Sequence, residues 1–284
     1  MSGLLAITGA TGLLGRAILA GAGGLGPVRA LVRPGSEPPR GVQVVYGDLD
    51  DDDALASLVQ GAGVVLHLAA AMGAASDGAL HRVNIEGTER LLSAALTAGV
   101  PRFVFTSSVA AAHPEMGPYS RTKAVAEQHV LEAALDGVVL RLPVLFGPGS
   151  QVERALLGLA RRLPVVPVIG GEALRPMHVG DAALACIAAV ERPGITGRFT
   201  LAGAESVEFA DFASRLLRAR GVRRPAVGLP PLLFLLAARG LEVVGRGGVS
   251  VESVRAAARG TPPASPNLHE LGWAPRPLGE RLMA

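Results

Sequence analysis

Tyr119 and Lys123 are the residues of this chain whose types and spacing most directly suggest chemistry. They lie four positions apart at the start of a helical pattern, and Lys123 is the only lysine among 284 residues. Four residues make about one helical turn, so the two side chains share a face. A phenol has an unperturbed pKa of about 10, and a neighbouring ammonium group lowers that pKa by favouring the phenolate. The pair is therefore a candidate proton donor or acceptor near neutral pH.

Hydroxyl residues precede this pair at the end of an apolar run. Residues 102–105 lead into Thr106, Ser107 and Ser108. In doubly wound sheets, ligands lie outside the carboxyl ends of the strands. One of these hydroxyls is thus placed to hydrogen-bond a substrate oxygen; the alternative is that small polar residues simply end the strand. The chain has no Gly-x-Ser-x-Gly elbow, which disfavours a serine hydrolase.

A glycine-rich turn lies near the N-terminus. Gly9, Gly12 and Gly15 directly follow the apolar run Leu4–Thr8 and open a helical pattern. Gly9 permits a tight turn, Gly12 lets the backbone approach a pyrophosphate, and Gly15 lets helix and strand pack closely. The helix N-terminus offers free N–H groups and partial positive charge to phosphates. The spacing Gly-x-x-Gly-x-x-Gly is wider than the usual fingerprint, but its position after the first strand predicts a dinucleotide site.

Arg33 ends the second apolar run, Val28–Val32. NAD-specific sites usually place an acidic residue about here, where it accepts hydrogen bonds from the adenine ribose. A guanidinium instead suits the 2′-phosphate of NADP through charge-assisted, forked hydrogen bonds. The sequence therefore predicts NADP as the cofactor, with NAD as the alternative if Arg33 is only a solvated arginine.

Short apolar runs alternate with helical patterns through the first half of the chain. Continuous apolar runs are typical of strands buried on both faces, and strand–helix alternation predicts a parallel sheet with right-handed crossovers. We expect an α/β fold, a doubly wound parallel Rossmann sheet. The expected strands are Leu4–Thr8, Val28–Val32, Val42–Tyr46, Val64–Leu68, Arg102–Thr106 and Val138–Leu142, and the expected helices are Leu13–Ala22, one opened by Asp50–Asp53, Ala79–Ala98 and Tyr119–Leu135.

The pattern changes after residues 147–149, Gly-Pro-Gly. Helices, Pro-rich loops and a possible short strand at Arg198–Leu201 replace the strict alternation. We expect a dinucleotide-binding domain over 1–150 and a smaller, mostly helical C-terminal cap over 151–284 that binds substrate, with some segments able to return to the first domain. The apolar stretch Leu229–Leu236 suits a hydrophobic substrate or, equally, packing in the core of the cap.

Composition excludes several classes of protein. Hydrophobic residues make up 49% and charged residues 18%, which excludes a disordered chain. The single cysteine, Cys186, excludes a disulfide scaffold or cysteine-based zinc site, and six histidines without ligand spacing predict no metal. The acidic run Asp50–Asp53 is interpreted as a helix cap. We expect no signal peptide, no membrane span and a cytoplasmic location. Arginines are scattered and aromatics few, so the pI of about 9.7 does not predict a nucleic-acid partner.

Taken in order, the motifs resemble the extended short-chain dehydrogenase/reductases of the NAD(P)-dependent epimerase/dehydratase superfamily. The likeness extends over nearly the whole chain, and its pattern is nearest to the 3β-hydroxysteroid dehydrogenase and dihydroflavonol reductase branch. The segments that carry it are Thr8–Gly15, Gly47–Leu49, His67–Ala70, Asn84–Thr88, Thr106–Ser108, Tyr119 with Lys123, Arg141–Pro143 with Gly147–Pro148, and Leu271–Pro275.

The resemblance implies roles for individual residues. Tyr119 is the implied general acid/base, Lys123 binds the nicotinamide ribose and tunes Tyr119, and Ser108 polarises the substrate oxygen, with Ser107 as the alternative. His67 is implied to be structural, and Asn84 to support the site indirectly. The residues implied to bind the cofactor are Gly9, Thr11, Gly12, Leu13, Leu14, Gly15, Arg33, Asp48, Leu49, Ala69, Ala70, Tyr119, Lys123 and Pro143.

The sequence departs from the sugar-nucleotide epimerases at Arg141-Leu142-Pro143-Val144, where many of them carry Arg-Tyr-Phe-Asn. Together with the apolar Leu229–Leu236, this predicts an NADP-preferring oxidoreductase that moves a hydride between nicotinamide and a carbonyl or secondary alcohol of an apolar or mixed small molecule. A sugar-nucleotide epimerase or dehydratase is the alternative, and a non-catalytic NAD(P)-sensing protein the second. The family resemblance also implies a homodimer formed through Ala79–Ala98 and Tyr119–Leu135.

Overall fold

The computed structural model describes residues 3–21, 25–73, 75–240 and 251–283. The chain forms two compact units that interleave along the sequence. It leaves the first unit after Leu142 and returns to it twice, so the units do not follow a single division at residue 150. The first comprises Met1–Leu142, Ala182–Leu201 and Ala264–Trp273, and the second comprises Pro143–Asp181, Ala202–Pro263 and Ala274–Ala284.

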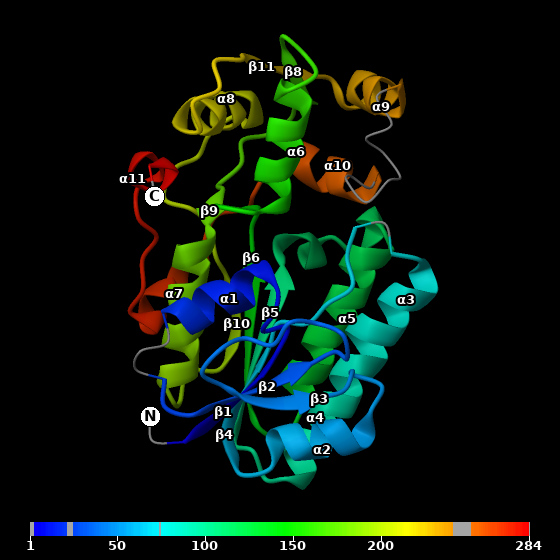
Figure 1. The fold of residues 1–284 in the computed structure, drawn as a ribbon, viewed down its shortest axis with the longest axis vertical. Helices are drawn as coiled ribbons and strands as arrows, with labels where there is room; N and C mark the ends of the chain where they lie inside the picture. Colours follow the sequence, from blue (N-terminus) through cyan, green and yellow to red (C-terminus); the bar gives the residue numbers. More distant parts are fainter. Residues whose placement is uncertain (1–2, 22–24, 74, 241–250, 284) are drawn as a thin grey trace. The chain divides into compact units, whose positions relative to one another are not determined.

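A seven-stranded parallel sheet forms the centre of the first unit (Figure 1). The strand order is β10-β6-β5-β4-β1-β2-β3. Strand β1 lies between β4 and β2, and its residues Leu5, Ala6 and Ile7 are fully buried. This order confirms the predicted doubly wound Rossmann sheet. The strands are β1 (Leu4–Thr8), β2 (Val28–Val32), β3 (Gln43–Tyr46), β4 (Ala62–His67), β5 (Arg102–Ser108), β6 (Asp136–Leu142) and β10 (Gly197–Thr200).

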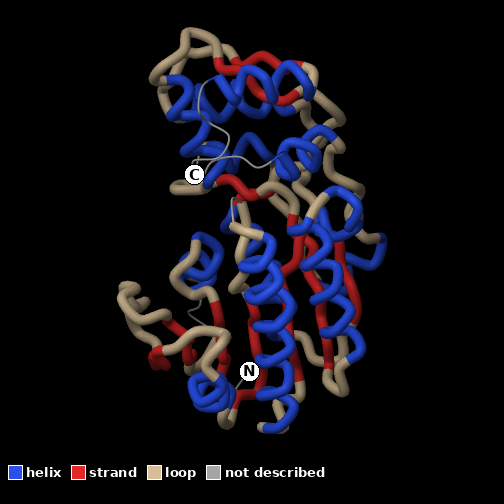
Figure 2. The backbone as a smooth tube through the Cα atoms, turned by 90° about the vertical axis from the view of Figure 1, so that its right-hand side faces the viewer, coloured by secondary structure: helices blue, strands red, loops and turns tan. Residues whose placement is uncertain are grey.

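Helices cover both faces of this sheet (Figure 1). One face carries α1 (Leu13–Ala20) and α7 (Val179–Glu191), and the other carries α2 (Asp52–Val59), α4 (Gly87–Thr97) and α5 (Pro118–Glu132). In Figure 2, the helices on this second face lie in front of the strands. The apolar faces of α2, α4 and α5 pack on the sheet in one continuous core. Because all seven strands are parallel, their carboxyl ends meet at one edge of the sheet, and the predicted site residues follow the strands at that edge.

Some helices begin or end at other residues than the sequence pattern predicts. The helix expected at Ala79–Ala98 begins at Asp77, because the Ser76 side chain caps it by accepting a hydrogen bond from the Ala79 N–H group. It then runs through α3 (Asp77–His81) and a π-helical turn (Arg82–Glu86) into α4. The Asp50–Asp53 run is a cap as predicted, since Asp51 accepts a hydrogen bond from the Ala54 N–H group at 3.0 Å.

The second unit combines short strand pairs with helices. Its helix α9 (Pro231–Gly240) contains the stretch expected either to bind a hydrophobic substrate or to pack in a core; only Phe234 of its described side chains is buried, while Leu232, Leu233 and Leu236 are exposed. Among the described residues, no helix has both the length and the hydrophobicity needed to cross a membrane. The remaining elements are β7 (Leu145–Phe146) with β9 (Met177–His178), β8 (Val166–Ile169) with β11 (Ala226–Leu229), α6 (Gln151–Ala160), α8 (Phe209–Ala219), α10 (Val251–Ala258) and α11 (Leu278–Leu282).

Candidate active site and cofactor-binding loop

The glycine-rich turn leaves the N-terminus of α1 open. Gly12 is the N-cap in an extended conformation, and its N–H group donates to the Gly9 carbonyl at 3.0 Å. No side chain caps this helix, and its first turn holds no acidic residue. The first N–H groups of a helix have no acceptor within the helix, so this end can bind an anion. Thr11, Leu13 and Leu14 are only partly buried around it.

Two glycines of the turn are required by close backbone packing. Gly9 has φ of +71°, and a Cβ atom there would lie 2.8 Å from the Ala69 nitrogen. A Cβ atom on Gly15 would lie 2.4 Å from the Gly9 carbonyl oxygen and 2.6 Å from Ala10 Cα. All three distances are too short for any side chain, because the obstructing atoms are backbone. The structure thus confirms the tight turn at Gly9, while Gly15 packs closely against the turn that follows β1 rather than against the strand itself.

Arg33 and Asp48 follow neighbouring strands. The Gly47 N–H group donates to the Val32 carbonyl at 3.1 Å, so the ends of β2 and β3 lie side by side. Arg33 is exposed, and no described residue pairs with its guanidinium. Asp48 is exposed and accepts a hydrogen bond from the Leu49 N–H group at 2.8 Å, while Leu49 is buried. The arrangement leaves one free cation and one carboxylate at the same sheet edge.

His67, at the end of β4, joins the loop strand to the helices. Its Nδ1 atom lies 2.7 Å from Thr8 Oγ1, and its Nε2 atom 3.0 Å from Thr88 Oγ1. Thr88 donates to the Asn84 carbonyl, and Thr8 accepts from the Ala69 N–H group, so Nε2 carries the proton and Nδ1 accepts one. Burial, and secondly the charge of Lys123, lower the pKa of His67 to about 3. His67 is therefore a neutral structural residue, as the resemblance implied.

Asn84 connects the loop after β4 to α5. Its Oδ1 atom accepts from the Ala71 N–H group at 2.8 Å, and its Nδ2 atom donates to the Ala71 carbonyl and to Thr122 Oγ1. Ala69 and Ala70, in the same loop, are partly exposed. Asn84 thus fixes the path of this loop relative to the helix that carries Tyr119 and Lys123.

The three hydroxyl residues at the end of β5 differ in their surroundings. Thr106 is buried and donates to the His67 carbonyl at 3.2 Å. Ser107 is buried, and its Oγ atom has no hydrogen-bond partner among the described residues. Ser108 is partly exposed, and its Oγ atom accepts from the Ala110 N–H group at 3.2 Å. Since Ser108 already has a donor at its oxygen, its own proton remains available for an acceptor outside.

Lys123 is almost completely buried on α5, one turn after the partly exposed Tyr119. Its Nζ atom donates to the Thr106 carbonyl at 2.8 Å and lies 3.9 Å from the centre of the Phe105 ring. Burial lowers the pKa of Lys123 to about 7, and the charge of Glu127 acts in the opposite direction. Pro143, also predicted at this site, is buried directly after β6.

A buried ion cluster lies one turn further along α5, and the sequence patterns did not predict it. Glu127 is fully buried and accepts hydrogen bonds from Arg141 Nε and Nη2 and from Arg198 Nε at 2.7–3.1 Å. The spacing of Glu127 four residues after Lys123 was a visible signal, but its arginine partners come from β6 and β10, far away in sequence. The cluster joins α5 to one edge of the sheet.

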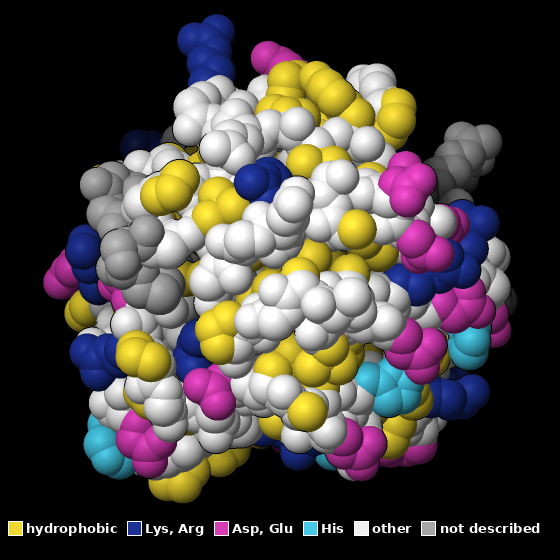
Figure 3. Space-filling view, turned by 90° about the horizontal axis from the view of Figure 1, so that it is seen from below, with side chains coloured by type: hydrophobic (Ala, Val, Ile, Leu, Met, Phe, Trp, Pro, Cys, Tyr) yellow, Lys and Arg dark blue, Asp and Glu magenta, His cyan; other side chains and the backbone are white. Residues whose placement is uncertain are grey.

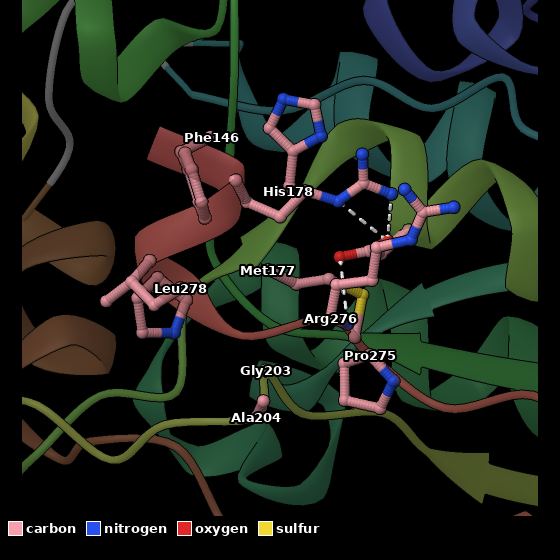
Figure 4. Close-up of a pocket in the computed structure, with 11 residues that line it drawn as sticks. Phe146, Met177, His178, Gly203, Ala204, Pro275, Arg276 and Leu278 are labelled. Carbon is pink, nitrogen blue, oxygen red and sulfur yellow. Dashed lines mark hydrogen bonds and ion pairs between the residues drawn. The ribbon is translucent and has the colours of Figure 1, made fainter. Parts of the chain in front are cut away.

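A polar pocket lies within the second unit, apart from the residues described so far (Figure 4). Asp181 is buried and pairs with Arg281, while His178 accepts from the Gly180 N–H group at 3.1 Å and packs edge-on against Phe146. Burial and the charge of Arg281 lower the pKa of His178, although Asp181 acts in the opposite direction. None of the sequence-predicted site residues lines this pocket. No group of metal-ligating side chains gathers within the described ranges.

Comparison with known proteins identifies the family. Residues 5–200 match the model of the NAD dependent epimerase/dehydratase family. A ceramide reductase of Caulobacter vibrioides is 37% identical over 206 residues, which are 67% of this chain and 62% of that protein. A 2-alkyl-3-oxoalkanoate reductase of Stenotrophomonas maltophilia is 32% identical over 255 residues, covering 77% of this chain and 76% of the relative. The chain thus matches less than two thirds of the ceramide reductase.

Solved structures show the same fold. A nucleoside-diphosphate-sugar epimerase from Staphylococcus aureus superposes with a TM-score of 0.80 over 99% of this chain and 100% of its own, at 22% identity. The chain belongs to the NAD-dependent epimerase/dehydratase family, within the extended short-chain dehydrogenase/reductases. It is accordingly an NAD(P)-dependent enzyme with a Rossmann fold.

Proposed function

We propose that this protein is an NADP-preferring oxidoreductase that reduces a ketone or aldehyde on an apolar small molecule, or oxidises the corresponding alcohol. The observation that carries the proposal is the placement of Lys123, buried, fixed to the Thr106 carbonyl and one helical turn after Tyr119. A buried ammonium group without a carboxylate in contact is costly, so its position calls for a functional explanation. When bound, the nicotinamide supplies or accepts the hydride.

The surroundings of each side chain support a separate role for Tyr119, Lys123 and Ser108. Lys123 stabilises the phenolate form of Tyr119 through its charge, and Tyr119 donates a proton to the substrate oxygen in the reductive direction. Ser108 directs its free hydroxyl proton to the same oxygen, because its own oxygen is held by the Ala110 N–H group. Ser107 is the weaker candidate, because it is buried.

The cofactor fits the residues around the glycine-rich turn. The open N-terminus of α1 would hold the pyrophosphate through the N–H groups of its first turn. Arg33 would bind the 2′-phosphate, and Asp48 and Leu49 would contact the adenine. Ala69 and Ala70 would line the path toward the nicotinamide, and Thr11, Leu13, Leu14 and Pro143 complete the proposed set.

Two observations support an apolar substrate. Val144 stands where many sugar-nucleotide epimerases carry an asparagine, so a hydrogen-bonding side chain is missing. Two relatives, the ceramide reductase and the 2-alkyl-3-oxoalkanoate reductase, are named for the reduction of molecules with hydrocarbon chains. Burial of such chains yields about 25 cal/mol per Å², whereas an unpaired phosphate loses its hydration.

The test is NADPH consumption by the wild type and Tyr119→Phe with 3-oxo compounds of increasing chain length. We expect turnover with the wild type and a fall of about 10²–10⁴-fold in the variant, with NADPH affinity unchanged. Nucleotide sugars with NAD+ or NADP+, in place of the ketone and NADPH, serve as the second arm, because epimerisation begins with oxidation of the sugar. Epimerisation without net formation of reduced cofactor would instead establish an epimerase, and cofactor binding without turnover of either substrate class would establish a cofactor-sensing protein.

Two further proposals concern the protein in the cell. We infer a homodimer in which α4 and α5 pair with their copies; the exposed Leu96 on α4 supports this surface. We also infer a cytoplasmic location, which the single buried Cys186 supports, since it needs no oxidising compartment. Sedimentation equilibrium and cell fractionation test them.

A further inference from the structure

Helix α9 is apolar on two opposite sides. Phe234 packs inward against Ile169 and Val254, in a small core of its own. Leu232, Leu233 and Leu236 are 69%, 52% and 56% exposed, and their spacing places them within about 100° of arc on the outer side. A helix that is apolar all round is normally covered, so the outer leucines indicate a partner.

The segment that contains α9 is also strongly basic. Residues 212–264 contain nine arginines and only two acidic residues, although the net charge of the whole chain is only +3. Acidic residues outnumber basic ones in the rest of the chain, and the face in Figure 3 mixes both signs. The arginines are spaced rather than consecutive, so a search for basic runs does not detect this segregation.

Two of these arginines are available on the surface beside the strand that leads into α9. Arg223 and Arg224 are exposed, and no described residue pairs with either side chain. They precede β11, which pairs with β8, and α9 packs on β8 (Figure 1). Val227 on β11 is 46% exposed. In contrast, Arg215 and Arg220 are neutralised by carboxylates.

We propose that this surface, which we call the α9 surface, docks on a lipid bilayer that contains anionic headgroups. The α9 surface consists of Leu232, Leu233 and Leu236 with Arg223 and Arg224. Exposed leucines on one side of a short helix insert into the boundary between headgroups and acyl chains, and nearby arginines attract the anionic lipid phosphates. The helix lies in the plane of the membrane and does not cross it. The exposed leucines and the two exposed arginines all lie within residues 223–236, on either side of β11, and this combination of apolar side chains and positive charge favours a membrane over a neutral protein groove.

Flotation with vesicles of equal parts phosphatidylglycerol and phosphatidylcholine tests the proposal, without cofactor or substrate. We expect the wild type to float with these vesicles and much less with phosphatidylcholine alone, and binding to weaken as salt is raised. Leu232→Gln/Leu236→Gln and, separately, Arg223→Gln/Arg224→Gln should each lower the partition coefficient by about tenfold or more.

Control variants remove exposed residues elsewhere in the chain. Tyr46→Gln/Leu184→Gln, at side chains that are 58% and 40% exposed, and Arg40→Gln/Arg82→Gln should float like the wild type, and circular dichroism confirms that all variants fold. Equal losses in the test and control variants, or no wild-type flotation, would overturn the proposal. So would concentration-dependent self-association that the leucine variants abolish, since the α9 surface would then pair with a second copy. Because no turnover is measured, these outcomes leave the proposed reductase activity untouched.

Discussion

Two successive turns of α5 bury opposite charges, and the two charges differ in their hydrogen-bond and ion-pair partners. Glu127 accepts four hydrogen bonds from three N–H groups of two arginines, which compensate its burial. Lys123, one turn earlier, is also buried, but its ammonium group contacts a backbone carbonyl and an aromatic ring. A compensated charge is a structural element. A buried charge with no ion pair and a lowered pKa is instead a candidate functional group, and this difference distinguishes Lys123 from Glu127.

The comparison also explains why the cluster lies where it does. Glu127 is joined by Arg141 of β6 and Arg198 of β10, so it fixes α5 against the sheet on the side away from β4. The position of α5 in turn determines where Tyr119 and Lys123 lie relative to the end of β5. We infer that the cluster of Glu127 with its two arginines holds the helix, while Lys123 acts on the substrate side.

The largest predicted effect concerns turnover. Lys123→Met should lower kcat by about 10²–10⁴-fold, comparable to loss of the general acid, because the phenolate loses its neighbouring charge. Glu127→Gln should lower kcat by less than about tenfold in the folded fraction. Steady-state kinetics with NADPH and a turned-over ketone make the measurement. Equal losses in both variants would remove the distinction between the two turns.

The second prediction concerns the free energy of unfolding, on which we expect Glu127 to have the large effect. Glu127→Gln should lower the free energy of unfolding by about 3–5 kcal/mol, because two arginine side chains lose their buried counter-charge. The exposed Glu132, five residues later, is the control, and Glu132→Gln should change stability by no more than about 0.5 kcal/mol. Urea denaturation followed by circular dichroism gives both values. A stability loss below about 1 kcal/mol at Glu127 would show that the cluster is not structural.

The third prediction concerns Arg33, an exposed charge that pairs with none of the described residues. If it binds the 2′-phosphate, Arg33→Ala should weaken NADPH binding by about 10- to 150-fold, corresponding to about 1.5–3 kcal/mol, and leave NADH binding nearly unchanged. Arg40→Ala, on the same β2–β3 connection, is the control. Calorimetric titration with both cofactors decides; parallel losses for NADPH and NADH would make Arg33 a general surface charge.

The last predicted effect is a gradual pH dependence of stability, of at most about 1.4 kcal/mol for each pH unit. With its pKa lowered from 10.5 to about 7, Lys123 carries a proton in both the folded and unfolded chain below pH 7, so the cost of its burial is fully present there. Between about pH 7 and 10.5 only the unfolded chain is protonated, so stability rises with pH, by at most about 1.4 kcal/mol per unit. The difference in stability between wild type and Lys123→Met should therefore shift in favour of the wild type from pH 7 to pH 9. A constant difference would mean that Lys123 titrates normally.

Local sequence determined the elements of the first unit. Apolar runs such as Leu4–Thr8 and Val28–Val32 became β1 and β2 with the predicted bounds, because strands buried on both faces need continuous apolar residues. The glycine turn was predictable for the same kind of reason, since Gly9 and Gly15 are required by backbone contacts that no side chain permits. The Tyr119–Lys123 spacing depends only on helical geometry. Their functional roles stay predictions.

Tertiary structure decided what depends on residues far apart in the chain. Glu127 is 14 residues from Arg141 and 71 from Arg198, and only the placement of β10 beside β6 brings the three together. The outward direction of Leu232, Leu233 and Leu236 was equally hidden, because an apolar run reads the same whether it packs in a core or faces outward. Sequence periodicity reports which residues are apolar and how they are spaced; burial and charge compensation depend on which elements the fold places against them.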